Sequence, residues 1–552
     1  MVERIMTMKT KKIYANMMLL VGLVWLLLTG LGNSSQAWAG ATDSMGKKAA
    51  HFPAPVRQTQ YIEGYTDKHS YAPGDTIHFH VSTNAPTFGI KVTRITFPWW
   101  DYTSSVATIT GLPGAFYPMP PQAWLGANWP TSYDMVVGQD WTSGAYLAQF
   151  VAEDGSVRYH PFYVRPAVPG ATSRIAYLGN FTTLAAYNLW GGKYFYSQPR
   201  IYKASLLRPF FLADGKGRSS WNLRMLSHLE NMGYVLEYIT EQDIEEHPDI
   251  LRNYDVVVLA GHHEYVSTTV YDALQDHHDR GGHLALFDAD ELYWQVRYEN
   301  NGDTVVCYKE ESEDNDPLFG FYNCRVTEAW GSDILNRPAE KLRGIQKNSL
   351  YAYFESGEYV VENAAHWIFE GTGVQNGDTF GTMMAQGEQD TIKDDSPQLD
   401  IILHGHRDVV KQGKVPPHGE TAAEMYAIYY ADTPEYGHPN GNGGMVFAAG
   451  TISGWVRALF NQPDSPKVQR ATMNIIDAML ANPPSPSNGD PILKYCDPCF
   501  VDINGDGVVN TNDFIVFLNL WNANNPVTDW NHDGEVNTAD FTAYINDWVT
   551  KC

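Results

Sequence analysis

The feature that most constrains this chain is a pair of acidic loops near its C-terminus, repeated at an offset of 27 residues. Each loop places a carboxylate or amide at positions 1, 3, 5, 9 and 12 and a glycine at position 6. That spacing wraps hard oxygen ligands around calcium, with the backbone carbonyl of position 7 as a further ligand. We therefore predict two bound Ca2+ ions rather than two Asx-rich turns without metal. The expected ligands are Asp502, Asn504, Asp506, Val508, Asn510 and Asp513 in the first loop, and Asp529, Asn531, Asp533, Glu535, Asn537 and Asp540 in the second.

The type of loop points to a small α-helical module over 496–552. An apolar helix is expected after each loop, over 514–521 and 541–548. Aspartate at position 12, with no helix before the loop, resembles the dockerin pattern more than an ordinary EF-hand. The resemblance implies a cohesin-like or surface scaffold protein as partner. Thr511-Asn512 and Thr538-Ala539 replace the paired hydroxyl motif of the best-known cellulosomal dockerins, so the identity of the cohesin stays open.

The N-terminus has the pattern of a secretory signal peptide over 1–39. A positive stretch that includes Arg4 and Lys12 precedes an apolar run over 17–28, which is short for a membrane span. Ala37-Trp38-Ala39 fits the small-x-small cleavage rule. We expect a secreted protein, extracellular or at the cell surface, with no stable membrane span after cleavage; the alternative is an uncleaved anchor.

Net charge excludes one class of partner. The formal charge is −25. A protein that binds nucleic acid needs basic patches to neutralise phosphates, and none is found outside the extreme N-terminus. We therefore expect no nucleic-acid partner.

Export permits disulfides, and the chain has five cysteines. Cys307 and Cys324 lie close in sequence and can bridge, and Cys552 can pair with Cys496 or Cys499. A single C-x-x-C at 496–499 also leaves zinc as an alternative, although no second pair of ligands lies near it.

Composition and periodicity divide the rest of the chain. Residues 40–60 are expected to be an N-terminal tail, and 61–168 a β-sandwich with a late hairpin of strands over 146–151 and 159–164. An α/β domain follows over 169–481, and a proline-rich linker over 482–495.

The α/β domain shows a βαβ rhythm. A helix over 221–232, a continuous apolar strand over 254–259, a helix over 268–280 and a strand over 283–287 follow one another. This predicts a doubly wound parallel sheet, similar to the flavodoxin-like sheet of glutamine amidotransferases, with ligands at the carboxyl ends of the strands.

Polar residues cluster where the apolar strand ends, at Gly261-His262-His263-Glu264-Tyr265. Histidine, glutamate and tyrosine side chains there can ligate a metal or transfer protons, and the alternative is a turn whose polar groups are satisfied internally. The turn carries no cysteine, which excludes the nucleophilic chemistry of glutamine amidotransferases at this position. The chain also has no G-x-S-x-G elbow.

The order of several short motifs resembles the large (beta) subunit family of N,N-dimethylformamidase. The resemblance runs from about residue 61 to 481. The motifs lie at 64–65, 71–75, 143–146, 187–192, 208–209, 254–265, 281–282, 293–297, 371–373, 387–390 and 444–451. The family usually has an acid where His263 stands and a small hydroxyl residue near Lys193, so the resemblance implies amide hydrolysis rather than dimethylformamide as the substrate.

The resemblance also implies a mononuclear iron held by two tyrosinates and one glutamate. Carried over motif by motif, the ligands of this Fe3+ would be Tyr146, Tyr187 and Glu264. Phenolate and carboxylate are hard anionic donors suited to trivalent iron. His262 would orient groups or shuttle a proton, and Glu388 would handle the amine leaving group.

Three functions follow as hypotheses. The first is a secreted, metal-dependent hydrolase that cleaves the C–N bond of a small amide and is attached to a scaffold by its C-terminal module; an oligomer is compatible with it. The second is a non-catalytic protein that binds carbohydrate or peptide, with which an aromatic content of 13% is compatible. The third is a polysaccharide-degrading enzyme, for which Asp288, Asp290 and Glu291 supply acids without a recognisable catalytic spacing.

Overall fold

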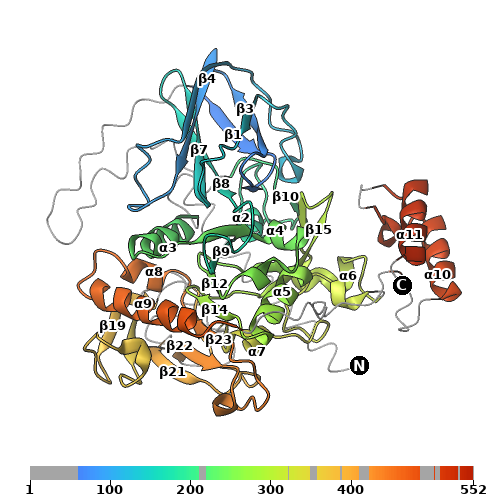
Figure 1. Cartoon of the computed structure of the whole chain (residues 1–552). Coiled ribbons are helices and arrows are strands. Elements are labelled where there is room, and N and C mark those ends of the chain that lie inside the picture. The colour runs from blue at the N-terminus through green and yellow to red at the C-terminus, as the bar shows by residue number, and fades with distance from the viewer. Residues whose placement is uncertain are drawn as a thin grey trace. The chain divides into compact units, whose positions relative to one another are not determined.

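The structure is a computed structural model, and Figure 1 shows the whole chain. It describes residues 60–210, 219–320, 322–347, 357–385, 388–408, 422–484, 501, 503, 510–531 and 535–550. Some predictions lie outside these residues: the signal peptide over 1–39, the tail up to residue 59, most of the linker, Cys496, Cys499, Cys552, and the calcium ligands Asp502, Asn504, Asp506, Val508 and Asp533.

The N-terminal domain is β-rich, as its alternating pattern predicts. β3 shows why: Ile77, Phe79 and Val81 are buried, whereas His78 and His80 between them are partly exposed. The buried residues enter a core shared by two sheets. One sheet has the order β1 (Ile62–Thr66), β3 (Thr76–Thr83), β6 (Tyr133–Val136); the other has the order β2 (Ser70–Tyr71), β8 (Val157–Val164), β7 (Gly144–Ala152), β4 (Thr87–Arg94), β5 (Ala107–Pro113). The predicted hairpin is β7 and β8, which pair antiparallel.

The second domain is built on a nine-stranded mixed sheet. Its parallel half has the order β11 (Glu237–Thr240), β9 (Ile175–Gly179), β12 (Val256–Leu259), β14 (His283–Leu286), β23 (Met445–Ala448). The sheet continues through antiparallel strands in the order β22 (Ala422–Ala431), β21 (Asp400–Asp408), β18 (Gly357–Val361), β19 (Thr379–Ala385). The parallel half agrees with the predicted alternation of strands and helices. The antiparallel half is not predicted by that alternation.

Helices cover both faces of the parallel strands. Val256 and Val258 of β12 pack into one core with α3 (Ser219–Asn231) and α9 (Ser465–Ala481). Val257 and Leu259 face the opposite core, where α5 (Thr268–Asp279) packs. A strand that is apolar at every position therefore buries both of its faces.

Shorter elements complete the second domain. The remaining helices are α2 (Phe181–Ala186), α4 (Glu241–Glu246), α6 (Ser312–Asn315), α7 (Glu340–Arg343) and α8 (Gly454–Ala458). A four-stranded sheet has the order β10 (Lys203–Ser205), β16 (Thr304–Val306), β15 (Trp294–Glu299), β13 (Tyr265–Ser267), and β17 (Gln346–Lys347) pairs with β20 (Asp390–Thr391). The 3-10 turns are η1 (Ala123–Leu125), η2 (Ile250–Asn253), η3 (Lys309–Glu311), η4 (Asn323–Arg325), η5 (Trp367–Phe369), η6 (Pro434–Tyr436) and η7 (Pro526–Thr528).

A buried aromatic group joins the two domains. The ring of His69, which precedes β2, lies 4.7 Å from Phe181 of α2 and 5.3 Å from Phe210. His160 of β8 stacks on Phe210 at 5.3 Å. Burial lowers the pKa of His69 to about 3, and it lowers the pKa of His160 well below its ordinary value.

The C-terminal repeat appears as two helices whose first residues are 27 positions apart, α10 (Thr511–Asn522) and α11 (Thr538–Thr550). Both are apolar, as expected, and Phe517 of α10 stacks on Tyr544 of α11 with ring centroids 3.8 Å apart. Together with Trp530 these rings form a small core.

The cysteines correct one expectation. Cys307 is a free, buried thiol, whereas Cys324 is disulfide-bonded. The two therefore do not bridge each other. No helix in the described part of the chain is long and apolar enough to cross a membrane.

Candidate metal centre

The centre is built on the turn that follows β12. Gly261 has φ +93°, and a Cβ placed there would lie 2.7 Å from Asn222 Cβ and 2.9 Å from its backbone nitrogen, so only glycine fits. His262 also adopts a positive φ, +90°. Two side chains hold this strained turn: Asp288 Oδ2 accepts the His262 amide at 2.5 Å, and Asn180 Nδ2 donates to Gly261 O at 2.7 Å. Such strain persists only where the surroundings enforce it, and it is typical of functional sites.

The turn directs Glu264 into a group of phenols. Glu264 is fully buried, and its Oε2 accepts from Tyr187 Oη at 2.5 Å. Its Oε1 accepts from Tyr196 Oη at 2.9 Å and from Trp294 Nε1 at 3.1 Å. The two phenol oxygens are 3.0 Å apart, and Tyr265 Oη donates to Tyr196 Oη at 2.8 Å. Two phenols and one carboxylate thus converge within hydrogen-bond distance, although 77 residues separate the first from the last.

Positive groups surround this carboxylate. Burial favours a raised pKa for Glu264, but the hydrogen bond and charge of His262, together with Lys347 and Lys309, hold that pKa well below its usual range. Burial and the Glu264 charge raise the pKa of Tyr196 well above its ordinary value. Among the protein groups, Glu264 is therefore the anion and Tyr196 the proton donor.

Lys309 is a buried cation that the sequence did not single out. Its ammonium lies 3.4 Å from the centroid of the Tyr196 ring and 4.9 Å from those of Tyr265 and Trp294. The Lys309 ammonium has no hydrogen-bond partner among the described residues, and Lys309 is 1% exposed. Burial lowers the pKa of Lys309 to about 8 against the opposing charge of Glu264. Below that pKa the ammonium places a positive charge over the face of the phenol ring.

The two residues expected to handle protons lie together at the same place. His262 Nε2 is 3.0 Å from Glu264 Oε2 and 3.2 Å from Glu388 Oε2. His262 Nδ1 faces the carbonyl oxygen of Ala289 at 3.0 Å, so that nitrogen carries a hydrogen. A second proton must then lie between His262 Nε2 and the carboxylates, because two acceptors would otherwise face each other. Lys347 Nζ approaches Glu388 at 3.9 Å and pairs with Asp290 at 2.5 Å.

A second set of buried charges supports the turn from behind. His263 Nδ1 is 3.4 Å from Asp288 Oδ2, and Arg343 joins Glu291 to Asp390 with nitrogen–oxygen distances of 2.7 Å. All five side chains are fully buried. Two groups of three side chains bring ligand atoms within 4.8 Å of one another: His262, Glu264 and Asp290, and His263, Asp288 and Glu291.

The structure does not bring Tyr146 to the centre, which corrects that part of the expected ligand set. Side chains alternate along β7: Ala145 and Leu147 face the core of the α/β domain, whereas Tyr146 and Ala148 face the core of the β-rich domain. There the Tyr146 ring stacks on Trp141 at 5.2 Å, and its hydroxyl donates to Thr142 O at 2.8 Å. Tyr196 instead stands beside Tyr187 and Glu264.

Four of the described calcium-loop residues cap the starts of α10 and α11: Asn510, Asp513, Asn537 and Asp540. Asn510 and Asp513 form a capping box at the start of α10. Asp540 accepts the backbone amides of Asn537 at 2.7 Å and Trp530 at 2.8 Å. Asp529, Asn531 and Glu535 are also described, and the other five expected ligands lie outside the described residues. The metal assignment of both loops stays a prediction.

Four residues of the centre were not assigned to it from the sequence: Tyr196, Trp294, Lys309 and Asp288, of which Asp288 was considered only as an acid of a polysaccharide-degrading enzyme. Tyr196 lies in the tyrosine-rich run over 187–196, so proximity to Tyr187 was its only signal. The others lie in β15, in η3 and after β14, and only the folded sheet edge brings them together.

Comparison with known proteins gives one clear family. The family described as N,N-dimethylformamidase beta subunit-like, C-terminal, matches residues 91–465. The N,N-dimethylformamidase beta subunits of Paracoccus aminophilus and of Alcaligenes sp are each 23% identical over 290 residues, which cover 48% of this chain and 37% of the relative. The match thus spans little more than a third of the length of these curated relatives.

Among solved structures, a Paenibacillus sp. cycloisomaltooligosaccharide glucanotransferase complexed with cycloisomaltoheptaose aligns with 44% of this chain and 33% of its own, at 11% identity. The TM-score of this alignment is 0.13.

Proposed function

Because the chain belongs to the N,N-dimethylformamidase beta subunit-like family, we propose that it hydrolyses the C–N bond of an amide at a metal centre formed by Tyr187, Tyr196 and Glu264. The observation that carries the proposal is the convergence of these three side chains, with oxygen–oxygen distances of 2.5, 2.9 and 3.0 Å. A merely structural turn does not need two phenols on one buried carboxylate.

The residues fit a hard, trivalent cation such as Fe3+. All three donors are oxygens that are anionic or become so on binding the ion, and Glu264 is already the anion of the group. Lys309 lies over the Tyr196 ring and favours a phenolate there. When bound, such an ion would polarise an amide carbonyl and lower the pKa of a bound water.

The chain's own residues would manage the protons. His262 and Glu388 hold a proton between Nε2 and Oε2, 3.2 Å apart, next to Glu264. In this proposal the shared proton passes from Glu388 to the amine nitrogen as the C–N bond breaks, and His262 Nε2, relieved of that proton, accepts one from the attacking water. Asn180 and Asp288 keep the turn, and therefore His262, in place.

The tyrosines are the least buried ligands of the site. Tyr187 and Tyr196 are partly exposed, whereas Glu264 and His262 are fully buried. We infer that the amide approaches over the phenols. Lys193, where the family usually has a smaller residue, directs its ammonium to the Trp124 ring at 4.8 Å. The relatives are named as beta subunits, so an oligomer is compatible with this function.

Export and attachment complete the proposal. The signal-peptide pattern over 1–39 supports secretion, and the two calcium-type loops support attachment to a cohesin-like or surface scaffold partner. The paired caps at Asn510 and Asn537 are consistent with two equivalent loops.

Metal analysis together with an amide panel tests the enzymatic proposal. The full chain, loaded with iron, should hold about one iron per chain and release amine from some of a set of small N-alkyl formamides and acetamides. Glu264→Gln should lose both properties, while Glu310→Gln, at an exposed carboxylate, should keep both. If Glu264→Gln retains full iron, the site assignment is wrong; if an iron-loaded chain cleaves no amide in the panel, the proposed reaction is not supported.

A further inference from the structure

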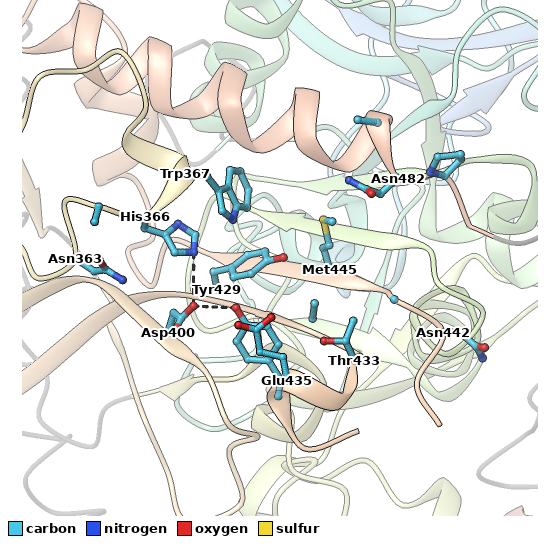
Figure 2. Close-up of a pocket in the computed structure, with 16 residues that line it drawn as sticks. Asn363, His366, Trp367, Asp400, Tyr429, Thr433, Glu435, Asn442, Met445 and Asn482 are labelled. Carbon is cyan, nitrogen blue, oxygen red and sulfur yellow. Dashed lines mark hydrogen bonds and ion pairs between the residues drawn. The ribbon is translucent and has the colours of Figure 1, made fainter. Parts of the chain in front are cut away.

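Figure 2 shows a large pocket, which lies at the opposite edge of the sheet from the candidate centre. Its lining includes Met445, the first residue of β23, whereas the centre follows Leu259, the last residue of β12. β12, β14 and β23 are parallel, so these two positions fall on opposite edges. The pocket has a volume of about 950 Å³, and it is a separate site because none of its lining residues belongs to the centre.

Aromatic rings form one wall of this pocket. The Trp367 ring lies 5.2 Å from Tyr429 at an interplanar angle of 89°, and the Tyr436 ring lies 5.8 Å from Tyr429 at 79°. His366 packs against both Trp367 and Tyr429, at 5.1 and 5.2 Å. Edge-to-face contacts fix each ring by its neighbour, so the wall is ordered before a ligand arrives. Figure 2 shows Trp367, His366 and Tyr429 grouped on one side.

Polar side chains line the remaining walls of the pocket. Asp400 accepts from Tyr436 Oη at 2.8 Å and lies 3.6 Å from His366 Nε2, so its carboxylate is held in one orientation. Glu435 supplies a second carboxylate. Neutral groups come from Asn363, Asn442, Asn482 and Thr433. Of the lining residues that the structure describes, none is a lysine or an arginine.

These features point to one class of ligand. Two carboxylates without a basic residue repel phosphates, sulfates and uronates. A small ammonium ion would leave most of 950 Å³ unfilled. Amides, a hydroxyl and oriented carboxylates beside flat aromatic faces match the alternating hydroxyl groups and C–H faces of a sugar ring. We propose that this pocket binds a neutral oligosaccharide, independently of the chemistry at Glu264.

Calorimetry on the full chain tests this assignment. The probes are the neutral hexaoses of cellulose, xylan, mannan and starch, with a galacturonate hexamer and tetramethylammonium for comparison. We expect one neutral hexaose to bind with a stoichiometry of one, and the galacturonate hexamer not to bind. Trp367→Ala should weaken binding at least tenfold, while Trp100→Ala, at an exposed tryptophan outside the pocket, should change it less than twofold.

A blocking variant guards against a folding defect in Trp367→Ala. Ala365 is an exposed lining residue, so Ala365→Trp fills the pocket without removing core packing, and it should also abolish binding. The proposal is overturned if no neutral hexaose binds, if binding survives both Trp367→Ala and Ala365→Trp, or if tetramethylammonium binds the pocket more tightly than any sugar. None of these outcomes depends on iron or on amide hydrolysis.

Discussion

Replacing Tyr196 and Tyr146 separately distinguishes the structural assignment of the metal centre from the one that motif resemblance implies. Tyr196→Phe keeps the ring but removes the oxygen that lies 2.9 Å from Glu264 Oε1. It also removes the acceptor of Tyr265 Oη. Tyr146→Phe removes the partly buried hydrogen bond to Thr142 O at 2.8 Å and leaves its stacked ring in the core of the β-rich domain.

Tyr146→Phe should change the free energy of unfolding, whereas Tyr196→Phe should change the free energy of metal binding. A neutral buried hydrogen bond contributes about 1 kcal/mol to stability, so Tyr146→Phe should lower the free energy of unfolding by about that amount and leave the iron in place. Even changes to residues that only support a metal ligand typically cost 10–100-fold in affinity, so loss of the Tyr196 oxygen should cost more than about 100-fold, or about 3 kcal/mol.

Iron per chain, the absorption band of a phenolate–iron complex and the rate of amine release should be measured side by side. We expect all three to fall in Tyr196→Phe and to stay near wild type in Tyr146→Phe. If Tyr146→Phe loses the iron and the band while Tyr196→Phe keeps both, the geometric reasoning is refuted.

Three further outcomes follow from particular residues. The pKa of His69 falls from 6.5 to about 3 on burial, so the folded chain takes up fewer protons than the unfolded chain. The free energy of unfolding should therefore decline as pH drops from about 6.5 toward 3, by about 2 kcal/mol at pH 5. The urea midpoints measured at pH 7.5 and pH 5.0 should lie closer together in His69→Phe than in the wild type. Gly261→Ala forces a Cβ to 2.7 Å from Asn222 at φ +93°, so it should cost about 2 kcal/mol in thermal or urea unfolding and reduce iron content; wild-type stability would contradict the strain argument. Asp540→Ala leaves three backbone amides without their acceptor. We expect Ca2+ to raise the melting temperature above its value in EDTA by less in this variant than in the wild type. An unchanged difference would argue against calcium in the second loop.

Local patterns predicted the parts of the fold whose residues are close in sequence. Val256–Leu259 is apolar throughout and is indeed a buried parallel strand, and the polar turn after it carries Glu264 at the sheet edge. The antiparallel strands over 357–431 were not anticipated, because long insertions with mixed periodicity carry no signal for the partner of each strand.

The choice between tyrosines shows what a motif cannot decide. Ala145, Tyr146 and Leu147 are all buried, so hydrophobicity does not say which face each occupies. The register of β7 decides it, and register depends on pairing with β4 and β8. Tyr196, Trp294 and Lys309 meet only through tertiary contacts between separate elements, so their proximity had no local signature.

The hydrogen bonds of Glu264 bear on how the protein would behave during purification. Tyr187, Tyr196, Trp294 and His262 together saturate its carboxylate with donors from the chain itself. Folding therefore does not depend on a cation at this position, unlike in small zinc domains. If the chain binds iron as proposed, a preparation without iron should look native by circular dichroism and by gel filtration. Amine release would then report the fraction of iron-loaded molecules rather than the quality of the fold.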